Sequence, residues 1–117
     1  MPRPDFVQHP ISGRAHLLDI ARHVKEHNLP PLEHFTESDG IPLSYLTDCV
    51  TESGVSIQPG DILLVRTGFM DALMALPEKE QNELLSGDTR PWSGVQPSEE
   101  VMRWHWDKGI AAVVTDG

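Results

Sequence analysis

Two short, uninterrupted apolar runs constrain the fold of this chain more than any other feature of its sequence. Ile62–Val65 and Ile110–Val114 have the length of strands, and neither shows the alternation of a half-exposed strand. Such runs are typical of strands that are covered on both faces. A helical pattern precedes each run, so the sequence predicts an α/β domain in which helices cover a sheet.

Turn residues divide the rest of the chain into further elements. We expect strands at 15–20, 61–67 and 110–115, and helices at 21–27, 43–53, 69–76, 77–85 and 98–107. Residues 1–42 hold five of the six histidines and six of the ten prolines, which predicts a loop-rich segment with one short strand. Residues 43–117 are expected to form the central α/β part of a single domain. Because a strand that is apolar on both faces needs cover on both, the end at residue 117 suggests a chain that has been cut off.

The charge balance argues against several classes of partner. The chain has 9 Lys+Arg against 18 Asp+Glu, a formal net charge of −9, and its basic residues are scattered. Binding to nucleic acid or to an anionic membrane is therefore not expected. The single cysteine, Cys49, cannot form an internal disulfide, and no apolar run approaches the roughly 20 residues of a membrane span. We expect a soluble, cytoplasmic protein in which Cys49 is a small buried apolar residue rather than a nucleophile.

One short motif suggests a metal site. His23, Glu26 and His27 fit the His-x-x-Glu-His pattern, in which two imidazoles on one helix face hold zinc while the glutamate activates water. The alternative is a solvated helix end, because Pro30 and Pro31 stop the helix almost at once. The remaining histidines of the N-terminal segment, His9, His16 and His34, are expected to be ordinary surface residues, as is His23 if it binds no metal.

Polar residues also follow the predicted strands. If the strands are parallel, Asp19, Arg66, Thr67 and Asp116 lie at their carboxyl ends, the edge where open α/β sheets bind ligands. These groups either face a ligand or form a structural ion pair in which Arg66 binds Asp19 or Asp116. In the last predicted helix, Trp104, His105 and Trp106 are expected to pack between the sheet and a neighbour rather than to bind a ligand.

Several separated blocks resemble one known family. They are residues 11–19, 60–69, 94–100, 104–107 and 111–116. In this order and spacing they resemble the cyclase family, which includes kynurenine formamidases and related metal-dependent hydrolases, and the wording is nearest to fungal members. The resemblance implies a swivelling β/β/α domain, here incomplete, with a mixed sheet covered by helices. It also implies hydrolysis of an amide, formamide or lactam of a small-molecule substrate at a divalent metal, usually zinc or manganese.

The ligand motif of that family is absent from this sequence. No His-x-Gly-Thr-His-x-Asp-x-x-x-His run occurs, and a further His and Glu would be expected beyond Asp116. No catalytic residue or metal ligand is therefore carried over, and Asp19, Arg66, Thr67 and Asp116 are expected to line or support the pocket. We expect a fragment of a kynurenine formamidase-type hydrolase of tryptophan catabolism that binds no metal and is inactive on its own.

Two alternatives stay open. The chain is then either a non-catalytic interaction subunit, which forms a homo-oligomer or pairs with a complete homologue, or a zinc protein that uses His23, Glu26 and His27.

Overall fold

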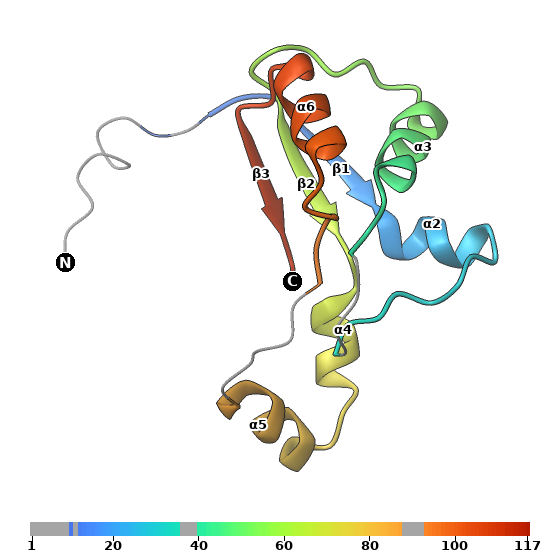
Figure 1. The fold of residues 1–117 in the computed structure, drawn as a ribbon, viewed down its shortest axis with the longest axis vertical. Helices are drawn as coiled ribbons and strands as arrows, with labels where there is room; N and C mark the ends of the chain where they lie inside the picture. Colours follow the sequence, from blue (N-terminus) through green and yellow to red (C-terminus); the bar gives the residue numbers. More distant parts are fainter. Residues whose placement is uncertain (1–9, 11, 36–39, 88–92) are drawn as a thin grey trace.

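The computed structural model describes residues 10, 12–35, 40–87 and 93–117, and their centre is a three-stranded sheet (Figure 1). Its strands are β1 (Ala15–Asp19), β2 (Ile62–Arg66) and β3 (Ala112–Thr115), in the order β1-β2-β3. Both pairings are parallel, so in the described residues the sheet is parallel rather than mixed. Leu18, Val65 and Thr115 lie side by side in the register, and the three carboxyl ends therefore share one edge.

Five helices accompany the strands in the described residues: α2 (Ile20–Glu26), α3 (Leu43–Ser53), α4 (Phe69–Met74), α5 (Glu78–Ser86) and α6 (Glu99–Lys108). All eight predicted elements are present, and the α/β prediction is confirmed. No helix among them is long and apolar enough to cross a membrane.

Side-chain caps explain where the helices start. The Asp19 carboxylate accepts a hydrogen bond from the Arg22 backbone N–H, so α2 begins directly at the end of β1. Ser98 caps α6 in the same way by accepting from the Val101 N–H. At the other end of α6, Gly109 takes the left-handed conformation (φ 69°), and a Cβ there would lie 3.0 Å from Pro59 Cα.

The hydrophobic core lies on one face of the sheet. Leu18, Leu63 and Val65 point to this face and are almost fully buried. The other members of the core come from α2, α3 and the segment between them: Ile20, Val24, Ile41 and Leu46. Trp104 of α6 and Ile110 pack against this cluster from the β3 side.

The opposite face of the sheet is open in the described residues, and the prediction of strands covered on both faces is wrong for them. Leu17, Leu64 and Val114 share one register row, and their exposed fractions are 60%, 37% and 54%. The apolar runs reflect burial under α2, α3 and α6 on one side only. The open row is an apolar surface of the kind that marks association sites.

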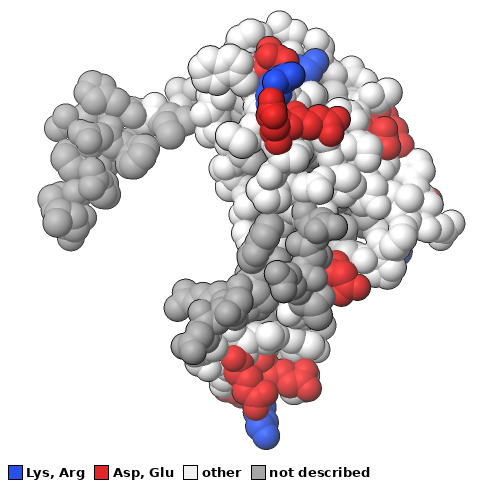
Figure 2. Space-filling model, in the orientation of Figure 1, with Lys and Arg blue, Asp and Glu red and all other residues white. Residues whose placement is uncertain are grey.

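The surface carries the acidic excess of the sequence. Figure 2 shows carboxylates gathered over α6 and α5 on one face of the molecule, with no broad basic patch there. Helix α5 contributes no buried residue and lies away from the sheet (Figure 1).

Candidate functional site

Arg66 forms two ion pairs at the carboxyl edge of the sheet. Its Nη1 lies 2.9 Å from Asp19 Oδ1, and its Nη2 lies 2.6 Å from Asp71 Oδ2. Pairing with Asp19 is one of the two partners that the sequence suggested, whereas Asp71 of α4 was missed. The Arg66 side chain is 41% exposed, so the pair is not buried and faces solvent at this edge.

Asp116 holds the turn that follows β2 instead of binding Arg66. Its Oδ1 accepts hydrogen bonds from the Thr67 N–H and the Thr67 hydroxyl, both at 2.7 Å, and its Oδ2 accepts from the Gly68 N–H at 3.0 Å. Burial favours the neutral acid, but these hydrogen bonds outweigh it and lower the pKa of Asp116. The carboxylate therefore fastens the end of β3 to the turn between β2 and α4.

A cavity of about 590 Å³ opens beside this edge. Arg66, Thr67 and Gly68 form one wall, and α2 with the segment after it forms the other: Ala21, Val24, Lys25, Asn28, Leu29, Pro31, Leu32 and His34. The volume lies in the range of small-molecule pockets. Of the four residues predicted for this site, Arg66 and Thr67 line the cavity, whereas Asp19 and Asp116 hold them in place through the bonds described above.

His34 is a residue of this cavity that sequence reasoning missed. Its Nδ1 lies 3.0 Å from the hydroxyl oxygen of Ser93, and its ring meets Phe69 edge-on at 6.1 Å between centroids. Burial lowers the pKa of His34, although Asp116 and Glu33 oppose the shift, so the imidazole is neutral near pH 7. No local signal marks His34, because its partners stand 59 and 35 positions later in the chain.

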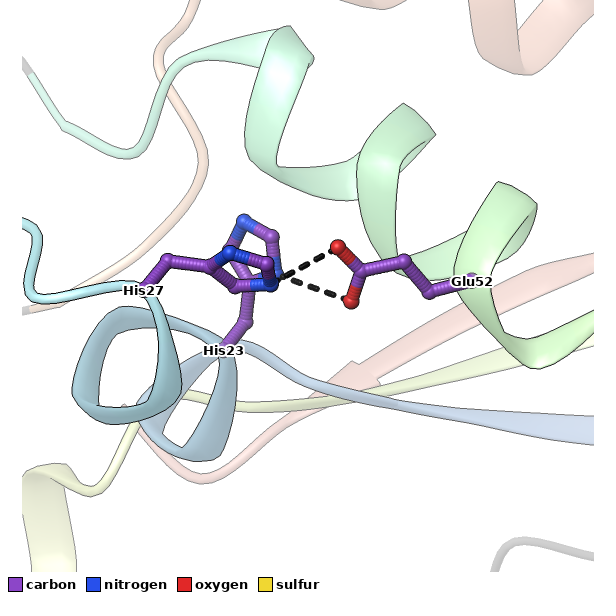
Figure 3. A group of neighbouring side chains, drawn as sticks. All are labelled: His23, His27 and Glu52. Atoms are coloured by element: carbon purple, nitrogen blue, oxygen red, sulfur yellow. Dashed lines mark ion pairs between the residues drawn. The ribbon is translucent and has the colours of Figure 1, made fainter.

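A second group of side chains could hold a metal ion. His23 and His27 of the α2 segment face Glu52 in the last turn of α3 (Figure 3). His27 Nε2 lies 2.7 Å from Glu52 Oε1, and His23 Nδ1 lies 3.5 Å from Glu52 Oε2. The assignment of Glu26 to this group is wrong, because its Oε1 instead accepts a hydrogen bond from Arg22 Nε at 2.8 Å on the exposed side of α2.

A third cluster lies at the amino ends of the strands, away from the cavity. The buried Asp61 carboxylate lies 3.0 Å from Arg14 Nη2 and 2.8 Å from His16 Nε2, and it accepts from the Gln58 N–H at 2.8 Å. The Arg14 and Gln58 hydrogen bonds hold the pKa of Asp61 well below its usual range. His16 and His23 are thus buried side chains with neighbouring carboxylates rather than the surface residues that the sequence suggested. His9 lies outside the described residues.

The remaining sequence predictions concern packing. Trp104 packs against the core as expected, but Trp106 is 86% exposed, so the packing prediction is wrong for it. Cys49 is half-buried against the core, and burial, with a smaller contribution from Glu52, raises the pKa of its thiol to about 11. A neutral thiol agrees with the apolar role that we predicted for Cys49.

Comparisons with known proteins agree on one family. The family model described as "Cyclase: Putative cyclase" matches residues 5–117. A solved crystal structure of a novel cyclase superposes with a TM-score of 0.71 at 22% sequence identity. That superposition covers 95% of this chain but only 33% of the solved chain, and at this identity it establishes the fold alone. None of the curated proteins matches this chain.

Proposed function

The chain belongs to the cyclase family, and on this premise we propose that it is the substrate-binding part of a hydrolase of the kynurenine formamidase type. Such an enzyme cleaves the C–N bond of an amide or formamide on a small molecule. The cavity at the carboxyl edge carries the proposal, because it joins two residues of the family-like blocks, Arg66 and Thr67, to a pocket of ligand size. The likeness to fungal members and a place in tryptophan catabolism belong to the same proposal.

The residues of this cavity do not fit the divalent metal that the family implies. Asp19 and Asp71 both hold the Arg66 guanidinium, and Asp116 accepts from the groups that follow β2. A cation placed here would meet the positive charge of Arg66 and compete for carboxylates that are already bound. The sequence also has no His-x-Gly-Thr-His-x-Asp-x-x-x-His run. We therefore propose that this chain supplies the pocket wall and that the catalytic metal ligands belong to other residues of a longer enzyme.

Within this proposal His34 and Thr67 contact the substrate, and Arg66 shapes the entrance. The neutral imidazole of His34 offers a hydrogen bond without a charge, next to the apolar wall that α2 provides. Asp19 and Asp71 fix Arg66 from two directions, so its guanidinium keeps one position at the rim.

Two measurements on the 117-residue chain test the proposal. N-formylkynurenine with added Zn²⁺ or Mn²⁺ should not be hydrolysed, because the catalytic ligands are absent. Kynurenine should nevertheless shift the NMR signals of Thr67 and Gly68, and His34→Ala should reduce these shifts, whereas Lys79→Ala on the remote α5 should not. Turnover by the chain alone would contradict the division of labour, and unchanged signals at Thr67 would contradict the pocket.

The open face of the sheet favours a second candidate, a non-catalytic subunit that pairs with another cyclase chain, its own copy included. Its exposed apolar row, Leu17, Leu64 and Val114, is suited to burial against such a partner. Sedimentation velocity should then show a species heavier than the 13.0 kDa chain. A stable monomer at all concentrations, alone or mixed with a longer homologue, would exclude this candidate.

A cytoplasmic location is part of the proposal. It is supported by the single cysteine, which has no partner for an internal disulfide and is held as a neutral thiol. Targeting of a fluorescent fusion of the chain to an oxidising compartment would contradict it.

A further inference from the structure

We propose that His23, His27 and Glu52 bind a divalent metal ion of the zinc class, which fastens α2 to α3 independently of the hydrolase pocket. This site goes beyond the proposed function, because it uses none of the cavity residues and requires no turnover.

The three side chains converge from two elements. Because His23 and His27 are four positions apart, they lie on the same face of the α2 segment, and their ring centroids are 4.5 Å apart. One potential ligand atom from each of the three residues lies within 4.8 Å of the others. A tetrahedral zinc shell places neighbouring ligand atoms about 3.3 Å apart. Small side-chain rotations of the half-exposed His27 and Glu52 therefore suffice to complete it.

An unsatisfied buried atom points independently to a ligand here. The His23 side chain is only 4% exposed, and its Nδ1 has no hydrogen-bond partner although it faces Glu52 Oε2 at 3.5 Å. A buried polar atom without a partner is costly, and such atoms in native proteins need an explanation. A metal ion bound to Nδ1 would provide one.

A carboxylate also lies behind the buried imidazole. Asp48 Oδ2 is 4.0 Å from His23 Nε2, the ring nitrogen that faces away from the proposed ion. Imidazoles that bind metals commonly direct their other N–H toward a carboxylate, which orients the ring. A modest rotation of the exposed Asp48 side chain would bring it to hydrogen-bond distance.

The donor set selects the class of metal. Two imidazoles and one carboxylate are typical ligands of Zn²⁺ and similar transition-metal ions. Mg²⁺ and Ca²⁺ prefer oxygen ligands throughout, so they should bind weakly.

The position of the site on α2 argues for a structural role. Ala21, Val24, Lys25 and Asn28 line the substrate cavity, whereas His23 and His27 face α3. The helix thus separates the proposed ion from the cavity. What the ion would do is join two elements that otherwise meet through apolar packing and the His27–Glu52 ion pair.

The test is a Zn²⁺ titration of the metal-free, full 117-residue chain. We expect one saturable equivalent, and at a free Zn²⁺ concentration about 100 times Kd we expect the Tm to rise by about 10 °C. Amide hydrogen exchange should slow in α2 and in the last turns of α3. Mg²⁺ at the same concentration should change neither quantity.

Variants at half-exposed positions keep the test independent of folding. His27→Ala and Glu52→Gln should each weaken Zn²⁺ binding at least about tenfold, since even outer partners of metal sites contribute 10- to 100-fold. Glu26→Gln is the matched control: it removes the carboxylate of the His-x-x-Glu-His motif, which binds Arg22 instead, and should leave the Kd unchanged. Circular dichroism checks that each variant folds.

Three results would overturn the proposal: no saturable Zn²⁺ binding by the parent chain, binding that His27→Ala and Glu52→Gln leave intact, or a loss in Glu26→Gln equal to theirs. None depends on hydrolase activity, so failure here would leave the proposed function standing.

Discussion

Asp61 illustrates how one buried carboxylate connects stability to pH. It is held by Arg14, by the Gln58 N–H and by His16, and its pKa lies well below the usual value. A carboxylate with a lowered folded-state pKa stabilises fully above the unfolded-state pKa of about 3.9, and this contribution is lost as the pH falls toward the folded-state value.

We therefore predict that Asp61→Asn lowers the Tm at pH 7 by about 5–10 °C. The parent chain should lose Tm steeply as the pH falls below about 4, and the variant should lose less over the same range. Thermal melts from pH 7 to pH 2 measure both curves. Parallel curves for the two proteins would show that Asp61 does not control acid stability.

Cys49 allows a prediction about reactivity. With a thiol pKa of about 11, only a small fraction is thiolate at pH 8, and the greater nucleophilicity of a high-pKa thiolate offsets this only in part. Alkylation by iodoacetamide at pH 8 should be at least about tenfold slower than that of a free cysteine. In 8 M urea the difference should disappear, and a fast reaction in the native state would contradict both the burial and the apolar role.

At the scale of elements, the contact between β3 and the turn after β2 depends on Asp116. Asp116→Ala removes the acceptor of three hydrogen bonds from Thr67 and Gly68. Because hydrogen bonds to a charged group contribute about 1.5–3 kcal/mol, we expect a loss of that order in the free energy of unfolding. Urea denaturation measures it.

Thr67→Val is the graded control for Asp116. It removes the hydroxyl donor but keeps both backbone N–H donors, so its loss should be smaller, about 1 kcal/mol. Equal losses in the two variants would mean that the carboxylate acts through the hydroxyl alone.

The elements were predictable because their signals are local. Ser98 and Gly109 mark the two ends of α6 by hydrogen bonding and backbone conformation within a few residues. The sites were predictable only where they follow from strand ends, as for Arg66 and Thr67. Glu52 could not be assigned to His23 and His27, because the register between α2 and α3 depends on tertiary packing, and Glu26 was misassigned because Arg22, one turn earlier, binds it.

The covering of the sheet is likewise a property of the whole molecule. An apolar run reports that a strand is buried, but it does not say on how many faces. Here the helices of the described residues gather on one face, and Leu17, Leu64 and Val114 remain exposed on the other. The same row would suit a longer enzyme or a partner subunit, so association in solution distinguishes the two proposed roles of the chain.

If the open face mediates self-association, charge should oppose it and apolar contact should drive it. The net charge of −9 repels a second copy, and salt screens this repulsion, so the association should strengthen between 0.05 and 0.5 M NaCl. The double variant Leu17→Lys/Val114→Lys places two charges in one register row and should sediment as a 13.0 kDa monomer at any salt concentration. Met74→Lys changes an apolar side chain of α4 that is equally exposed, 66% against 60% for Leu17, and should associate like the parent. Since the control adds positive charge without altering the open face, association lost in both variants would assign the effect to charge and remove the face from consideration.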